Sequence, residues 1–133
     1  MQTDWAEQPR GRTVLVVDDE LLLRIVVART LRQAGYRVWV AANPAAALIM
    51  LASAPTKPDL ILSDVHMPGM NGVDFAIELR RCWAELPVVL MSSREPAGLP
   101  QGLTAAFLPK PFGAEALLRV MDSALNQDKR RSA

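Results

Sequence analysis

The stretch from Leu60 to Gly72, LILSDVHMPGMNG, decides the fold of this chain. It opens with an apolar run that ends in Asp64, after which proline and glycine break the chain into a turn. A short apolar run bounded by turn residues is typical of a strand that is buried on both faces. The stretch therefore places the Asp64 carboxylate at the C-terminal end of a strand, the edge where open α/β sheets bind ligands.

Other apolar runs are also followed by polar residues that can bind metal or phosphate. Thr13–Val17 precedes Asp18 and Asp19, Val88–Met91 precedes Ser92, and Ala106–Pro109 precedes Lys110. If these strands are parallel, their carboxyl ends meet at one edge of the sheet. Three carboxylates, a hydroxyl and an ammonium group gathered there would suit a divalent cation and a phosphoryl group.

Strand patterns alternate with helical patterns along the chain. We expect strands near 13–17, 36–41, 59–63, 87–91 and 105–108, and helices near 20–34, 44–53, 72–83 and 112–126. This alternation predicts βαβ units, and right-handed crossovers restrict the topology to an α/β fold with a doubly wound, five-stranded parallel sheet.

Residues 94–104 break the alternation. Pro96, Gly98, Pro100 and Gly102 fall within this stretch, and in a helix interior proline costs roughly 3 kcal/mol and glycine about 1. We predict an irregular, mobile segment with at most one helical turn, so that the fourth crossover helix is shortened or lost.

Length and composition bound the function. The 133 residues predict one domain at 13–127, with a flexible leader at 1–12 and a polar tail at 128–133. A net charge of +1 gives no overall attraction to nucleic acid. The single cysteine, Cys82, excludes an internal disulfide, and no apolar run is long enough to span a membrane. We expect a cytoplasmic protein with no direct nucleic-acid or membrane contact.

Four motifs resemble those of the receiver domain of two-component response regulators, a CheY-like superfamily. They are VVDDE at 16–20, SDVHMPGMNG at 63–72, PVVLMSS at 87–93 and FLPKPF at 107–112. The resemblance covers about residues 12–127 and implies a sheet order of 2-1-3-4-5. It also implies a signalling phosphoacceptor rather than an enzyme.

The resemblance also implies roles for individual residues. Asp64 would accept a phosphoryl group from a histidine kinase or histidine phosphotransfer protein. Mg²⁺, with Mn²⁺ as a substitute, would be held by Asp18, Asp19, Asp64 and the backbone carbonyl of His66. Ser92 and Lys110 would bind the phosphoryl group, and Phe107 would act with Ser92 as the switch. A cis Lys110–Pro111 peptide bond would aim the lysine across the site.

Three other interpretations fit parts of the sequence. A pseudo-receiver that acts as a binding scaffold would lack phosphorylation, but the intact acidic, serine and lysine positions argue against it. A receiver cut from a DNA-binding regulator or hybrid kinase would look the same as a stand-alone one. A flavodoxin-like cofactor binder needs a phosphate-binding loop after the first strand, where Asp18 and Asp19 would instead repel phosphate.

The first helix carries more apolar residues than one core-facing stripe needs. Spacing at i, i+3, i+4, i+7 and i+8 assigns the core stripe to Leu23, Val26, Val27, Thr30 and Leu31. Leu22 and Ile25 then lie on a neighbouring, exposed face beside Arg29. Because apolar surface without a core role often marks a contact site, we predict that Leu22 and Ile25 contact the phosphodonor protein.

Overall fold

A computed structural model describes residues 11–94, 102 and 106–132, with side chains up to residue 126. The described elements are β1 (Thr13–Val17), α1 (Leu21–Gln33), β2 (Arg37–Ala41), α2 (Pro44–Ser53), β3 (Leu60–Asp64), α3 (Gly72–Cys82), β4 (Val88–Ser92), β5 (Ala106–Pro109) and α4 (Ala114–Ser132). The described helices include none that is long and apolar enough to cross a membrane.

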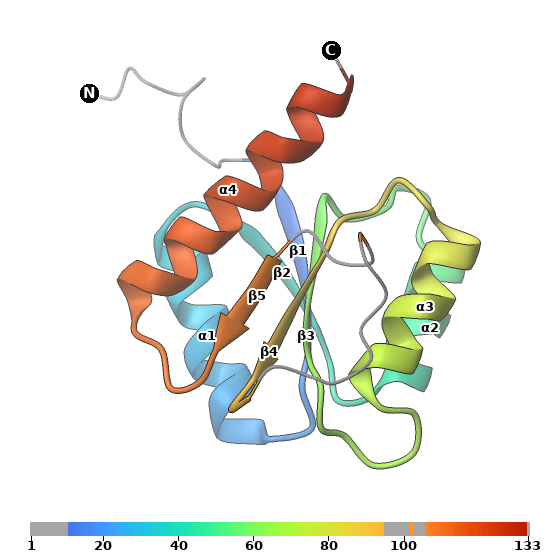
Figure 1. Ribbon diagram of the computed structural model, residues 1–133, viewed down its shortest axis with the longest axis horizontal. Coiled ribbons are helices and arrows are strands. Elements are labelled where there is room, and N and C mark those ends of the chain that lie inside the picture. The colour runs from blue at the N-terminus through green and yellow to red at the C-terminus, as the bar shows by residue number, and fades with distance from the viewer. Residues whose placement is uncertain (1–10, 95–101, 103–105, 133) are drawn as a thin grey trace.

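The five strands form one parallel sheet in the order β2-β1-β3-β4-β5 (Figure 1). This confirms the predicted fold and strand order. The register keeps the carboxyl ends of the central strands level, because Val17 pairs with Ser63 and Asp64 pairs with Met91. Residues that follow these strands therefore start from the same edge of the sheet.

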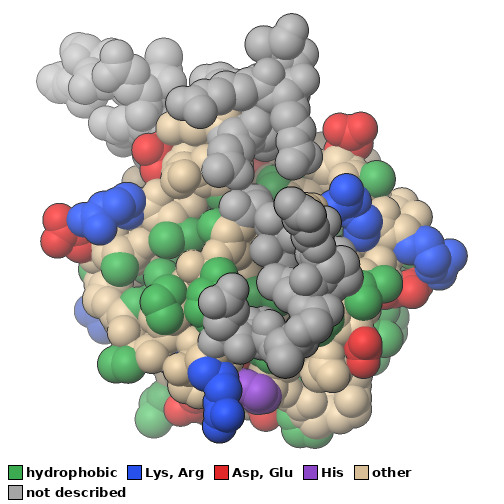
Figure 2. All heavy atoms as spheres, in the orientation of Figure 1, with side chains coloured by type: hydrophobic (Ala, Val, Ile, Leu, Met, Phe, Trp, Pro, Cys, Tyr) green, Lys and Arg blue, Asp and Glu red, His purple; other side chains and the backbone are tan. Residues whose placement is uncertain are grey.

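Helices cover both faces of the sheet, α1 and α4 on one face and α2 and α3 on the other (Figure 1). Alternate residues of β1 point to opposite faces, so Val14 and Val16 join the core under α1 and α4. Leu15 and Val17 join the core under α2 and α3. Figure 2 shows hydrophobic side chains gathered over the first turns of α4 and beside β5.

The helices that follow β2 and β3 begin at asparagine caps. The Asn43 side chain accepts a hydrogen bond from the backbone N–H of Ala46 at 2.8 Å, and the Asn71 side chain accepts one from Asp74 at 2.9 Å. Each cap satisfies a backbone N–H that has no partner within the helix. The caps set where the loops at the carboxyl edge end and the helices begin.

Two expectations from the sequence are corrected by the structure. Val26 is 58% exposed and does not belong to the core stripe; the buried residues of α1 are Val27, Ala28 and Leu31. The helix at the C-terminus ends at Ser132 rather than near 126, so most of the expected polar tail at 128–133 is helical. This helix contains neither glycine nor proline, the two residues that most disfavour a helix interior.

Two further predictions fall largely outside the described residues. Of the stretch 94–104, only Arg94 and Gly102 are described, so its predicted irregularity and mobility remain untested. The predicted flexible leader at 1–12 likewise has only Gly11 and Arg12 in the described part.

Candidate functional site

Three carboxylates meet at the carboxyl edge of the sheet, where β1 and β3 end. Asp18, Asp19 and Asp64 each offer an oxygen atom, and these atoms all lie within 4.8 Å of one another. Asp18 is fully buried and Asp64 is 6% exposed, whereas Asp19 faces solvent. The convergence expected from the strand ends is therefore present, and Asp19 forms its open side.

Lys110 places a cation against this acidic cluster. Its Nζ donates a hydrogen bond to Asp64 Oδ1 at 3.2 Å and lies 3.8 Å from Asp18 Oδ2. The lysine backbone N–H donates to the carbonyl of Ser92 at 2.8 Å, which ties the end of β5 to the end of β4. The Lys110–Pro111 peptide bond is cis, as expected.

Ser92 lies on β4, the strand beside β3, and Phe107 lies on β5, the next strand of the sheet. Ser92 is fully buried at the end of β4, and its Oγ accepts a hydrogen bond from the backbone N–H of Arg94 at 3.3 Å. Phe107 is half-buried on β5 and packs against the core under α2 and α3. The serine hydroxyl is thus held near the edge that carries Asp64, one strand away.

Gly72 allows the loop after β3 to fold back onto the strand. A Cβ atom at this position would overlap the Asp64 carbonyl oxygen and lie 2.6 Å from the Cα of Val65. The Gly72 N–H donates to the Val65 carbonyl at 2.7 Å. His66, the only histidine of the chain, lies in this loop and is exposed (Figure 2). No role for Gly72 was predicted from the sequence, although glycine often stands where two backbone segments approach closely.

Burial raises the pKa of the Asp18 carboxyl group above its ordinary value. The hydrogen bond from the Glu20 N–H lowers this pKa, the neighbouring Asp64 carboxylate raises it, and Lys110 lowers it. Within the described part of the chain, the buried Oδ2 of Asp18 has no hydrogen-bond partner. A buried acceptor without a partner is unfavourable unless something binds it.

These observations fit a bound divalent cation. The repulsion among three carboxylates is only partly offset by one lysine, and a cation would relieve it and would also supply a partner for Asp18 Oδ2. All the side-chain donors are oxygen atoms, the ligands that Mg²⁺ prefers. Asp18, Asp19 and Asp64 are the residues placed to hold it.

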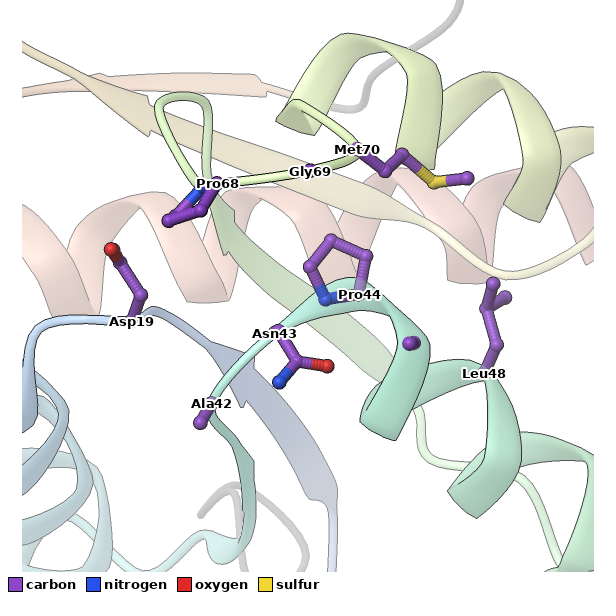
Figure 3. Close-up of a pocket in the computed structure, with 9 residues that line it drawn as sticks. Asp19, Ala42, Asn43, Pro44, Leu48, Pro68, Gly69 and Met70 are labelled. Carbon is purple, nitrogen blue, oxygen red and sulfur yellow. The ribbon is translucent and has the colours of Figure 1, made fainter.

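Hollows in the surface flank the cluster on two sides. One of about 460 Å³ adjoins Asp19 and lies between the start of α2 and the loop after β3, where Pro44, Leu48 and Met70 supply an apolar lining (Figure 3). Another of about 370 Å³ is lined by Leu23 and Phe112 beside Lys110. The cluster is thus reached from an open, partly apolar surface.

The N-terminal half of α1 presents apolar side chains to solvent. Leu22 is 70% exposed and Ile25 is 52% exposed, which confirms their predicted exposure. Leu21 and Val26, each 58% exposed, extend the same surface. Arg24, a half-buried residue of this helix, was not predicted from the sequence to have a role; it donates a hydrogen bond to the backbone carbonyl of Asp18.

Comparison with known proteins identifies one family. The profile of the response regulator receiver domain matches residues 14–122. The response regulator MprA of Mycobacterium bovis (strain BCG / Pasteur 1173P2) is 36% identical over 125 residues, which cover 90% of this chain and 53% of the relative. MprA of Mycobacterium avium (strain 104) is 36% identical over 121 residues, 87% of this chain and 52% of the relative. This chain therefore spans about half the length of these relatives.

Solved structures give the same result. The chemotaxis protein CheY4 of Vibrio cholerae matches with a TM-score of 0.77 and 33% identity, covering 85% of this chain and 98% of that one. The receiver domain of the hybrid histidine kinase CckA matches with a TM-score of 0.71 and 34% identity, with the same coverage. The response regulator TrrA of Thermotoga maritima, solved in complex with Mg(2+)-BeF, matches with a TM-score of 0.78 and 26% identity, again with the same coverage.

Proposed function

Because this chain belongs to the response regulator receiver domain family, we propose that Asp64 accepts a phosphoryl group from a phosphohistidine in a Mg²⁺-dependent reaction. One observation carries the proposal. Three carboxylates lie within 4.8 Å of one another, with the Lys110 ammonium group 3.2 Å from the proposed acceptor oxygen. That arrangement suits phosphoryl transfer, in which the protein mainly positions groups and neutralises charge.

The proposed reaction moves one phosphoryl group. A carboxylate oxygen of Asp64 attacks the phosphorus atom of the phosphohistidine, the new P–O bond forms and the P–N bond breaks. The imidazole of the donor leaves and takes up a proton from water, and Asp64 becomes an aspartyl phosphate. Carboxylates form covalent intermediates of this kind in other phosphoryl-transfer proteins.

Other residues would bind and orient the phosphoryl group. Lys110 would pair with one phosphoryl oxygen, which requires its present hydrogen bond to Asp64 Oδ1 to loosen or be shared. Ser92 would donate its hydroxyl to another, and Phe107 would move inward when Ser92 shifts. Mg²⁺ bound by Asp18, Asp19, Asp64 and the His66 carbonyl would neutralise phosphoryl charge. The Mg(2+)-BeF complex of the relative TrrA supports this metal. We propose Mn²⁺ as a substitute, because it also prefers oxygen ligands.

Two features favour a protein partner over a diffusible donor alone. The apolar face of α1, with Leu22 and Ile25, starts directly after the acidic cluster. The hollow beside Lys110 reaches Leu23 on the same helix. We propose that a histidine kinase or histidine phosphotransfer protein docks on α1 and presents its phosphohistidine to Asp64.

Incubation with a small acyl phosphate and Mg²⁺, followed by intact-mass measurement, tests the proposal. The wild-type chain should gain the mass of one phosphoryl group, and chelation of the metal should prevent the gain. Asp64→Asn should abolish it without loss of fold. Asp74→Asn, which changes a carboxylate outside the cluster, should leave phosphorylation intact. Phosphorylation of Asp64→Asn at the wild-type level would refute the assignment.

Failure of the wild-type chain to take up phosphate would favour the alternative of an unphosphorylated scaffold. A second alternative is that this receiver works as part of a longer regulator or hybrid kinase. The greater length of the MprA relatives and the match to the receiver domain of CckA favour this alternative. Its cytoplasmic location remains a prediction.

A further inference from the structure

We propose that Arg24 is a positioning residue for the metal site, because its guanidinium group holds the backbone of Asp18 so that one carboxylate oxygen remains available for the cation. The inference rests on the proposed Mg²⁺-dependent function. It concerns a residue that lies outside the acidic cluster.

Four polar atoms of Asp18 can form hydrogen bonds, and three of them are engaged by the protein. The backbone N–H donates to the Ala41 carbonyl at 3.2 Å, and Oδ1 accepts from the Glu20 N–H at 2.8 Å. The backbone carbonyl accepts from Arg24 Nη1 at 2.7 Å. The fourth atom, Oδ2, is buried and has no hydrogen-bond partner among the described residues.

Arg24 holds both ends of the turn between β1 and α1. Its backbone N–H donates to the Glu20 carbonyl at 3.0 Å, the first hydrogen bond of the helix. Its side chain reaches back to the Asp18 carbonyl. The turn that carries Asp18, Asp19 and Glu20 is therefore clamped between one residue of α1 and the end of β2. Without the guanidinium group, the part-buried Asp18 carbonyl would lose a charge-assisted hydrogen bond and the turn could rotate.

The charge of Arg24 and its position predict opposite effects on metal affinity. A guanidinium group near the cluster repels a divalent cation, so removing its charge alone should tighten Mg²⁺ binding. Loss of positioning should weaken binding, because residues that orient metal ligands typically change affinity by about 10- to 100-fold when they are replaced. The direction of the change therefore separates the two roles.

Arg24→Met keeps a long, helix-favouring side chain and removes both the charge and the donors. Its matched control is Arg29→Met, which removes the same charge from an exposed position on the same helix. Calorimetric titration with Mg²⁺ should show that the Kd of Arg24→Met is about tenfold higher than that of wild type. The Arg29→Met protein should stay within about twofold of wild type, because Arg29 is exposed and salt screens exposed charges.

A second measurement needs no metal. In the metal-free protein, the Glu20 amide should exchange with solvent faster in Arg24→Met than in wild type, because the turn that bonds it to Asp18 Oδ1 has loosened. Arg29→Met should leave this amide unchanged. If Arg24→Met melts below the assay temperature, Arg24→Lys takes its place. It keeps the charge but loses the planar fork, and we expect weaker Mg²⁺ binding and faster Glu20 exchange there too.

Unchanged or tighter Mg²⁺ binding in the Arg24 variant would overturn the inference, and so would equal weakening in the Arg29 variant. Either result leaves the proposed function standing, because wild-type protein would still bind the metal. Absence of Mg²⁺ binding in wild-type protein would instead remove the proposed function, and the role of Arg24 with it.

Discussion

The two edges of the sheet each carry an aspartate that joins neighbouring strands, but the two side chains are left in different states. At the amino edge, Asp59 precedes β3, and its Oδ2 accepts a hydrogen bond from the Thr13 N–H at 2.7 Å. Its own N–H donates to the Thr13 carbonyl at 2.8 Å. At the carboxyl edge, Asp18 Oδ1 accepts a hydrogen bond from the Glu20 N–H, whereas its buried Oδ2 lies 3.8 Å from Lys110 Nζ and has no hydrogen-bond partner among the described residues.

The difference separates a structural carboxylate from one that is available for binding. Asp59 uses its charge to fix the start of β1, and the backbone supplies its partner. In the described part of the chain, Asp18 Oδ2 accepts no hydrogen bond, and burial and the Asp64 carboxylate both raise the pKa of this carboxyl group. Such an arrangement is unfavourable in the metal-free protein, and a bound cation would relieve it.

The largest expected effect comes from closing the carboxyl edge sterically. Gly72→Ala would push a Cβ atom into the Asp64 carbonyl and the Val65 backbone, which we expect to destabilise the fold by about 3 kcal/mol. Phosphorylation by a small phosphodonor should fall as the loop after β3 moves. The measurements are urea unfolding and intact mass.

Gly113→Ala is the control for that substitution. Nothing lies within 4 Å of a Cβ atom built at Gly113, so its unfolding free energy should change by less than about 0.5 kcal/mol. If the two alanine variants proved equally stable, the close packing of Gly72 against β3 would be wrong.

The comparison of the two aspartates predicts opposite changes in stability. Asp59→Ala should destabilise the protein by about 1–2 kcal/mol, because the Thr13 N–H loses its partner. Asp18→Asn should stabilise the metal-free protein near neutral pH, because it removes a buried charge. Thermal melts with and without Mg²⁺ would measure both effects. Added Mg²⁺ should stabilise wild type and Asp59→Ala, but should stabilise Asp18→Asn much less.

The pH dependence follows from the direction of the Asp18 pKa shift. The Asp18 carboxyl group binds its proton more tightly in the folded state than in the unfolded state. Its protonation therefore stabilises the fold fully below the ordinary aspartate pKa, and this stabilisation is lost as the pH rises through the raised pKa. The advantage of Asp18→Asn over wild type should therefore shrink as the pH falls. An advantage that grew on acidification would contradict this assignment of the buried charge.

The smallest expected effect is on partner docking beside the carboxyl edge. Changing both Leu22 and Ile25 to serine should slow transfer from the cognate phosphohistidine protein several-fold, because both side chains are exposed and apolar. Phosphorylation by a small acyl phosphate should be spared. Ile49→Ser is the matched control, since Ile49 is 66% exposed on α2. Equal losses with both donors would indicate damage to the site, and no loss with either would exclude this face as the dock.

Much of the site could be predicted because it depends on strand ends. An apolar run bounded by turn residues predicts a strand, and parallel strands bring their carboxyl ends to one edge. The residue after each run was therefore enough to predict that Asp18, Asp19 and Asp64 would meet and that Lys110 would lie beside them. The functional roles of these residues came from the resemblance and await the experiments above.

Other features could not be predicted because they depend on packing between elements. Helical periodicity assigned Val26 to the core, yet the boundary of the buried face of α1 is set by the sheet and α4, and Val26 falls outside it. Periodicity likewise ended the last helix near residue 126, where the run of periodic apolar residues in the sequence stops, although the helix continues to Ser132.

What the sequence determined by itself was the fold class and the identity of the acidic, basic and hydroxyl groups at one edge of the sheet. What only the tertiary structure decided was the state of each atom there: the Asp18 Oδ2 that no described residue hydrogen-bonds, the overlap that only glycine avoids at position 72, and the hydrogen bond from Arg24. The physical reason is the separation of the interacting residues along the sequence. Residue patterns report local conformation, whereas hydrogen-bond partners and burial are settled when segments remote in sequence pack together.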